Sequence, residues 1–111
     1  MRATVLIKDV FQMVGVGVVP VGIVTKGVLK QGMKTNIEGK IMTVKFIEKQ
    51  HQQTKEAHEG EKIGFSLKNA KKSLLLKFRE QEVTFYEYED EIPIISKESE
   101  KEEGFFSSLF K

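Results

Sequence analysis

One segment near the N-terminus strongly limits how this chain can fold. Seven of the eleven residues in Val14–Val24 are valine or isoleucine, and Gly15, Gly17, Pro20 and Gly22 interrupt them. β-Branched side chains lose rotamer freedom in a helix and pack well on a pleated sheet. Glycines inside such a run are typical of bulges or close backbone approach, and a proline is typical of a bulge or a sheet edge. The segment therefore predicts strands rather than a helix.

Short apolar segments with alternating polarity recur along the chain and predict further strands. They are Thr4–Lys8, Val28–Gln31, Lys34–Glu38, Ile41–Glu48, Glu61–Leu67, Ser73–Arg79 and Val83–Tyr88. The polar segment Gln50–His58 has some helical character, but its place between strands favours a long hairpin excursion. Seven or eight short strands without strand–helix alternation indicate an all-β fold, either a closed antiparallel barrel or a sandwich. The predicted core includes Leu6, Phe11, Phe46, Ile63, Phe65, Leu74, Leu76 and Phe78.

Length and composition indicate one globular domain. The chain has 111 residues, a mass of 12.7 kDa and 40% hydrophobic residues, which is enough to bury a core without help. It has no run of 18 apolar residues, no N-terminal signal pattern and no cysteine, so we expect a soluble cytoplasmic protein without membrane spans. We place the barrel domain at residues 1–92, a flexible acidic linker at 93–104 and an apolar tail motif at 105–111.

Charge is distributed unevenly. Residues 1–86 carry 15 Lys and Arg against 8 Asp and Glu, whereas residues 87–111 carry 8 acidic residues against 3 lysines. A basic body with an acidic tail is common in proteins that bind nucleic acid. A solvated acidic linker on a mildly basic domain has the same pattern. Lys68, Lys71 and Lys72 cluster around one predicted turn. With the phenylalanines assigned to the core, the pattern predicts either contact of the lysines with the RNA backbone, rather than with stacked bases, or no nucleic-acid binding at all.

The sequence contains no pattern that indicates catalysis. The glycines of Gly15–Gly22 are followed by β-branched residues and not by a helix that could bind a pyrophosphate. His51 and His58 have no third ligand at a fixed spacing, so we interpret them as solvated loop residues and expect no metal site. No serine or threonine lies in a nucleophile context. We therefore predict a protein that is not an enzyme and has no cofactor.

The glycine spacing resembles the second domain of translational GTPases of the elongation factor Tu family. The similar blocks are Asp9-Val10-Phe11, the glycines from Gly15 to Gly39, and Ala57 through Gly60, Ile63-Gly64-Phe65 and Lys68-Asn69-Ala70. The resemblance covers about residues 3–79 and implies a small closed antiparallel β-barrel that functions in translation. Because the barrel begins at residue 3, the resemblance implies the barrel as a stand-alone domain, without the family's GTP hydrolysis.

The resemblance also implies an RNA site. In the family, this barrel helps to hold the 3′ end of aminoacylated tRNA, and the matching positions here are Lys8, Phe11, Met13 and Val19. The family usually has an acidic residue at the position of Lys8 and arginines at the positions of Val16 and Ile23. We interpret these two apolar residues as partner-binding positions.

The last residues form a distinct apolar motif. Phe105, Phe106, Leu109 and Phe110 would share one face of a helix. The motif predicts a docking peptide, and folding back onto the barrel or a frayed end are the alternatives. Two functions follow: a non-catalytic, translation-associated module that contacts tRNA or ribosomal RNA, or a protein-interaction adaptor that uses an apolar barrel patch and the tail.

Overall fold

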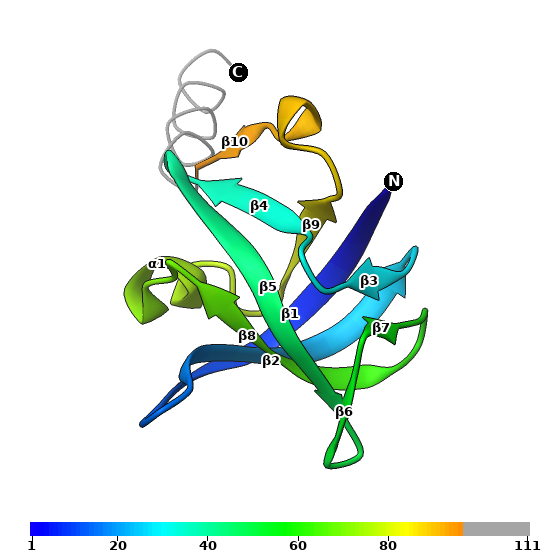
Figure 1. The fold of residues 1–111 in the computed structure, drawn as a ribbon. Coiled ribbons are helices and arrows are strands. Elements are labelled where there is room, and N and C mark those ends of the chain that lie inside the picture. The colour runs from blue at the N-terminus through cyan, green and yellow to red at the C-terminus, as the bar shows by residue number, and fades with distance from the viewer. Residues whose placement is uncertain (97–111) are drawn as a thin grey trace, which may run out of the picture.

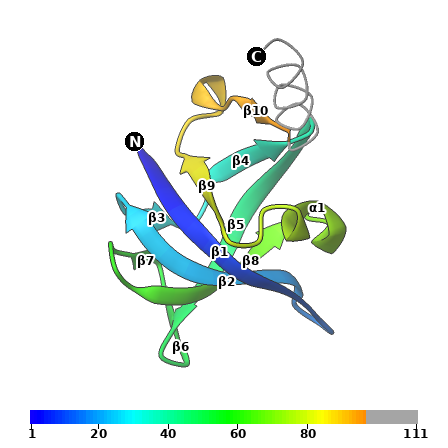
Figure 2. The same ribbon diagram turned by 180° about the vertical axis from the view of Figure 1, so that it is seen from behind.

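Six antiparallel strands close a barrel in the computed structural model, which describes residues 1–96 (Figures 1 and 2). The pairing order around the barrel is β4–β9–β1–β2–β8–β5, and β5 pairs with β4 to complete the circle. The barrel strands are β1 (Arg2–Met13), β2 (Gly17–Lys26), β4 (Lys34–Ile37), β5 (Lys40–Lys49), β8 (Lys62–Lys68) and β9 (Gln81–Tyr86). The prediction of a closed antiparallel barrel is therefore confirmed.

Short elements extend the barrel at its rim. β6 (Gln52–Thr54) continues the sheet beyond β5 as a hairpin, which is the excursion that the polar sequence predicted. β3 (Leu29–Lys30) pairs with β7 (Glu56–Ala57) in a separate two-stranded sheet. After the 3₁₀ turn η1 (Glu89–Glu91), β10 (Ile94–Ile95) pairs in parallel with β4. The residues predicted as a tail motif, 105–111, lie outside the described part of the chain.

The inward faces of the strands form one core. Phe65 of β8 and Phe85 of β9 pack edge to face in it, with ring centroids 5.5 Å apart, a favourable aromatic geometry. Of the predicted core residues, Ile63, Phe65 and Phe78 are buried, whereas Leu6 and Leu74 are only half-buried. Phe11, Phe46 and Leu76 are exposed, so their assignment to the core was wrong.

One predicted strand is a helix. Within Ser73–Arg79, predicted as extended, the chain forms part of α1 (Lys72–Leu76), which packs against β1. No residue of this segment is β-branched and three are leucines, so local propensity favours a helical turn. The helix buries Leu75 and turns Leu76 toward solvent, which explains why the strand alternation predicted the wrong leucine.

Pro20 does not lie at a sheet edge. It occupies the middle of β2, opposite Val10 of β1, where the pairing between β2 and β8 is interrupted between Val18 and Val21. The missing proline N–H is thus placed where the ladder is open. β1 carries a bulge between Ile7 and Asp9, but Pro20 pairs with Val10 in regular register, so this proline marks neither an edge nor a bulge.

Candidate functional site

A groove of about 560 Å³ opens on the outside of the barrel, over β2, β5 and β8. Side chains from the β1–β2 hairpin form one wall, and β5 with its turn into β6 forms the other. This volume falls in the range of ligand pockets, roughly 300–1,000 Å³. We call it the outer groove and define it by Met13, Val16, Val19, Phe46, Gln50 and His51.

A β-bulge in β5 places Phe46 in the outer groove. Val44 pairs with Leu67 of β8 but Phe46 pairs with Ser66, so Lys45 is an extra residue on β5. The extra residue shifts the inward–outward alternation by one position. As a result Ile47 is fully buried, and Phe46, predicted to be core, is 46% exposed. The backbone N–H of Phe46 donates a hydrogen bond to Oγ of Ser66 at 3.2 Å, which holds the bulge.

Lys45 and Phe46 present a cation and an aromatic ring together. The Nζ atom of Lys45 lies 5.8 Å from the centroid of the Phe46 ring, within the range of a cation–π interaction. Both side chains are exposed and both line the outer groove. This pair supplies an aromatic surface beside a positive charge, which is the combination that binds an unstacked base and its phosphate.

The opposite wall is an apolar hairpin tip. Met13, Val14 and Val16 are all exposed at the turn between β1 and β2, where Gly15 and Gly17 adopt positive φ angles of 81° and 107°. These conformations suit glycine because it has no Cβ. The turn therefore projects three apolar side chains from the barrel, and Figure 1 shows this hairpin extending from the body of the molecule.

Two non-glycine residues with positive φ angles form the turn between β5 and β6. Lys49 pairs with Gln52, so Gln50 and His51 form a two-residue loop with φ angles of 51° and 64°. Positive φ at both loop positions is the backbone of a type I′ turn, which favours Asn-Gly. Left-handed conformations are costly for other residues and persist most often at functional sites. Here the conformation places Gln50 and His51 at the rim of the outer groove.

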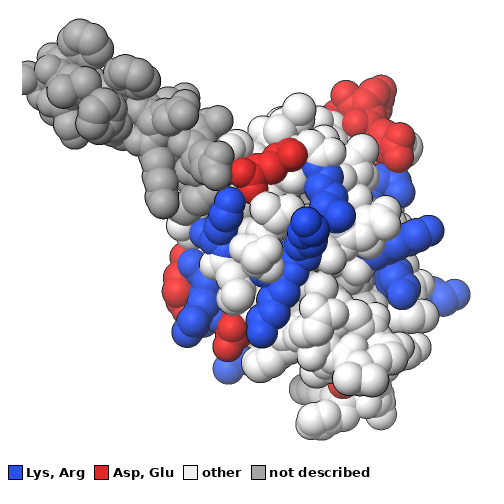
Figure 3. Space-filling model, turned by 90° about the vertical axis from the view of Figure 1, so that its left-hand side faces the viewer, with Lys and Arg blue, Asp and Glu red and all other residues white. Residues whose placement is uncertain are grey.

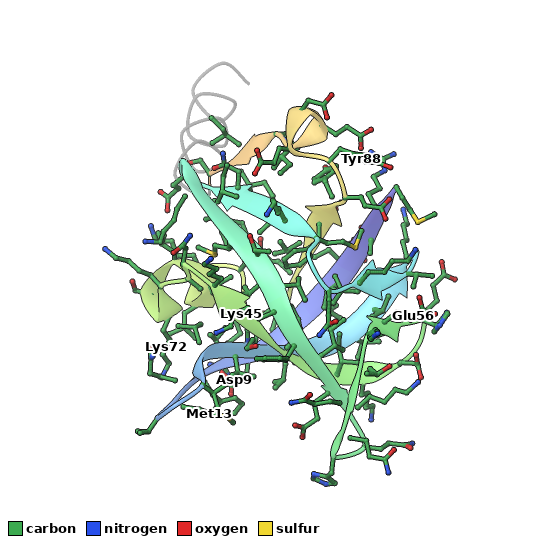
Figure 4. All side chains as sticks on the ribbon, viewed as in Figure 1. Asp9, Met13, Lys45, Glu56, Lys72 and Tyr88 are labelled. Carbon is green, nitrogen blue, oxygen red and sulfur yellow. The ribbon has the colours of Figure 1, made fainter. Side chains whose placement is uncertain are left out.

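Lys45 and Lys62 line the outer groove together with Glu48, and Lys68, Lys71 and Lys72 follow at the end of β8 and the start of α1. Among residues 1–96, Lys45, Lys68, Lys71 and Lys72 form no ion pair, whereas Lys8 pairs with Glu80 at 2.8 Å. Figure 3 shows Lys and Arg side chains gathered on this side of the molecule, above an uncharged region. In Figure 4, Lys45, Met13 and Lys72 lie on one side, and Glu56 and Tyr88 lie on the other.

Glu61 holds the turn that precedes β8 in place through two hydrogen bonds. Its Oε1 atom accepts a 2.6 Å hydrogen bond from the backbone N–H of His58, and its Oε2 atom lies 2.5 Å from Nζ of Lys49. The hydrogen bond from Lys49, followed by the one from the His58 backbone, lowers the pKa of Glu61 from its ordinary value of 4.5. The carboxylate thus ties β5 to the turn that precedes β8.

The structure brings together part of the residue set that the sequence predicted as a site. Met13, Val16 and Val19 line the outer groove, and Phe11 lies on the same outer face because it pairs directly with Val19. Lys68, Lys71 and Lys72 follow one another at the end of β8 and the start of α1, all exposed.

Two predicted positions are not in the groove lining. Lys8 is paired with Glu80 on the outside of β1. Ile23 is half-buried and pairs with Lys62, which lines the groove. Val16 lies in the turn before β2, seven residues earlier in the chain, so up to about 23 Å of extended backbone separates it from Ile23.

Sequence reasoning missed Lys45, Phe46, Gln50 and His51 as site residues. The sequence did contain one indication that Phe46 is exposed. Phe46 and Ile47 are adjacent, and adjacent residues of a regular strand cannot both point inward. His51 and His58 are exposed, and Nε2 of His58 lies 3.2 Å from Oε1 of Glu56. Within residues 1–96 no three His, Asp or Glu side chains are grouped as a metal site would need, and no helix is long and apolar enough to cross a membrane.

Comparisons with known proteins relate the barrel to translation elongation factors. Elongation factor 1-alpha of Thermofilum pendens is 46% identical over 71 residues, which are 62% of this chain and 16% of that protein. Elongation factor 1-alpha of Methanococcus vannielii is 41% identical over 68 residues, 60% of this chain and 16% of that protein. The chain thus spans about a sixth of the length of these relatives. No protein-family model matches the chain.

Solved structures show the same fold. Translation elongation factor SelB from Methanococcus maripaludis covers 78% of this chain with a TM-score of 0.65 and 18% identity, and the match takes 18% of that structure. The bacterial selenocysteine-specific elongation factor covers the same share with a TM-score of 0.61 and 21% identity, over 14% of its own chain. The chain therefore forms a β-barrel like that of translation elongation factors, as the sequence resemblance implied.

Proposed function

We propose that the barrel is a non-catalytic RNA-binding module of translation, which takes an unstacked nucleotide of tRNA or ribosomal RNA in the outer groove. The observation that carries this proposal is the half-exposed Phe46 ring, with Lys45 beside it and an apolar wall opposite. Base stacking on an aromatic side chain contributes about 1–3 kcal/mol per base. Similarity to elongation factor 1-alpha supports translation as the context.

The lysines next to the groove would hold the phosphates. Lys68, Lys71 and Lys72 form no ion pair among the described residues, so RNA phosphates would not have to displace an acidic partner within the barrel. Lysines that neutralise phosphates release counterions, which makes binding steeply dependent on salt. In this proposal the lysines supply most of the affinity for RNA, and the groove recognises an unstacked nucleotide at an RNA end or in an RNA loop.

Titration of tRNA and ribosomal RNA at low and moderate salt tests the proposal. The triple variant Lys68→Glu, Lys71→Glu, Lys72→Glu should abolish binding in about 50 mM salt, where phosphate contacts are strong. The matched control reverses three lysines near the β3–β7 ribbon, Lys26, Lys30 and Lys55, and changes the net charge equally. Equal losses in the two variants would mean nonspecific attraction and would contradict a defined face.

Phe46→Ala separates the groove from the lysines. It should weaken binding about 5- to 160-fold, which corresponds to the loss of one stacked base, and it should leave the salt dependence unchanged. A barrel that binds neither RNA in about 50 mM salt refutes the proposal.

The adaptor function has one observation in its favour, which is the exposed apolar tip at Met13, Val14 and Val16. Exposed apolar patches of this kind also mark protein-docking surfaces. A barrel that binds no RNA but loses a protein partner when Val14 and Val16 are changed to serine would establish that alternative.

A further inference from the structure

We propose that the chain's own segment Phe105–Phe110 occupies the outer groove when RNA is absent, with the acidic residues before it lying over the lysines. The segment would thereby inhibit the site. Docking of the segment in the groove does not depend on the proposed RNA function, whereas inhibition of the site rests on it.

The outer groove is lined by apolar and polar residues, and its apolar part is left uncovered by residues 1–96. Met13, Val16 and Phe46 are each 46% exposed although they surround a single cavity. Exposed large apolar side chains that gather at one site mark an interaction surface, whereas isolated ones need no explanation. An occupant of this groove should therefore present several apolar side chains on one face.

The segment at residues 105–110 has that composition. It places Phe105, Phe106, Leu109 and Phe110 at positions i, i+1, i+4 and i+5, which share one face of a helix, and puts Ser107 and Ser108 on the other. So short a segment is not helical alone in water. Contact with an apolar groove would supply the burial that orders it, as in other helix-in-groove interactions.

The connection is long enough to reach the groove. Ile95 pairs with Ile37, which pairs with Lys40, so the described chain leaves β10 beside the start of β5. Phe46 lies six residues further along β5, about 20 Å at 3.3 Å per residue. Two strand spacings separate β10 from β5 and add roughly 10 Å sideways. Residues 97–104, when extended, span about 26–29 Å, which exceeds the combined distance of about 22 Å.

The charges along this path are complementary. Residues 98–103 carry four glutamates and one lysine. On the barrel, Lys34 pairs in register with Thr43, and Thr43 pairs with Lys68, which brings lysines of β4 and β8 to the two sides of β5. Lys45 follows on β5 itself, and neither Lys45 nor Lys68 has an ion-pair partner among residues 1–96. An acidic strand over these lysines would imitate the phosphates of RNA.

Occupation by the segment and by RNA would exclude each other. A phenylalanine ring and a nucleobase would both use the face of Phe46, and glutamates and phosphates would both use the lysines. RNA would therefore have to displace the segment, and the apparent affinity would fall by the fraction of molecules in which the groove is closed.

Disulfide trapping tests the docking, and the cysteine-free chain makes the experiment clean. In the double variant Met13→Cys, Leu109→Cys, both cysteines lie on the docking surfaces, so oxidised glutathione should form an intramolecular disulfide, detected by electrophoresis and peptide mass. The control variant is Tyr88→Cys, Leu109→Cys. Tyr88 is more exposed than Met13 and lies eight residues before Ser96, so chain connectivity favours it, yet it is away from the groove (Figure 4). We expect the Met13 pair to close at least tenfold faster.

Two results would overturn the proposal. Equal closure rates for the two pairs would show that the segment has no preference for the groove. Disulfide-linked dimers whose yield rises with protein concentration would show that a second copy, and not the same chain, fills it.

RNA titration tests the regulatory part separately. Deletion of residues 104–111 should tighten RNA binding several-fold, and the oxidised Met13→Cys, Leu109→Cys variant should lose binding that dithiothreitol restores. If the deletion variant binds RNA no better than the full chain, inhibition is refuted. If no variant binds RNA but the Met13 pair still closes selectively, the proposed RNA function fails and the docking stands.

Discussion

Lys49 and Glu61 join the two sides of the hairpin excursion between β5 and β8 through contact of the Lys49 Nζ with the Glu61 Oε2 at 2.5 Å. The same carboxylate accepts the His58 N–H, so one side chain organises both the turn and the strand. Sequence spacing does not indicate this pair, because Lys49 and Glu61 are brought together only by the hairpin.

The lowered pKa of Glu61 makes stability depend on acid pH. Because the pKa is lower in the folded than in the unfolded chain, the ionised carboxylate stabilises the fold above the ordinary value of 4.5. This contribution is lost as the pH falls through the folded-state pKa. Thermal unfolding of Glu61→Gln should therefore show a lower Tm than wild type at pH 7 and a smaller difference at pH 3. A difference that stays constant with pH would contradict this role of the carboxylate.

The bulge at Lys45 predicts opposite outcomes for two adjacent substitutions. Ile47 is fully buried and Phe46 is half-exposed, so Ile47→Ala should cost about 2–5 kcal/mol of unfolding free energy. Phe46→Ala should cost less, about 1 kcal/mol, because only about half of its side chain is buried. Chemical denaturation measures both, and a large loss for Phe46→Ala would mean that the alternation continues without a bulge.

The barrel was predictable because its strands are encoded locally. Alternating polarity in Glu61–Leu67 and the glycine-rich, β-branched run from Val14 to Val24 each correspond to a barrel strand. The resemblance to elongation factors added the closure, since the pattern alone left a sandwich open. Met13 and Val19, for which the resemblance implied an RNA site, both line the groove, and their role there stays a prediction.

The groove itself was not predictable in the same way. The bulge at Lys45 depends on pairing with β8, about twenty residues away in the chain, and one extra residue moves Phe46 from the inside to the outside. α1 was missed because leucine alternation also fits a strand, although no β-branched residue supports one. β10 was missed because its parallel pairing with β4 is non-local and has no signal in two isoleucines.

Gly22 and Gly64 lie on neighbouring strands but should respond differently to a methyl group. A Cβ on Gly22 would lie 2.1 Å from the backbone oxygen of Leu6, whereas a Cβ on Gly64 would meet nothing closer than 3.5 Å. Gly22→Ala must therefore push β1 away from β2, and we expect a loss of at least about 1–3 kcal/mol. Gly64→Ala should be neutral or stabilise by up to about 1 kcal/mol, because alanine loses less entropy on folding. Denaturation midpoints distinguish the two, and equal effects would refute the close approach.

The two turns that flank β5 offer a test of strain at the outer groove. Glu38 and Gly39 form the β4–β5 turn, and Gln50 and His51 form the β5–β6 turn, with positive φ at all four positions. The second position is glycine in one turn and histidine in the other, and only the histidine lines the groove.

His51→Gly should therefore stabilise the barrel and weaken its function. A left-handed residue other than glycine costs about 1–2 kcal/mol. Glycine removes this cost, but its greater freedom in the unfolded chain destabilises the fold by about 0.4–1 kcal/mol. We expect a net gain of up to about 1 kcal/mol in unfolding free energy, together with weaker RNA binding because the groove loses a rim side chain. Glu38→Gly is the control in the other turn; because it also removes the 3.3 Å ion pair of Glu38 with Lys77, it is compared with Glu38→Gln, and the two should bind RNA equally. If His51→Gly binds RNA as well as wild type, the strained turn does not serve the groove.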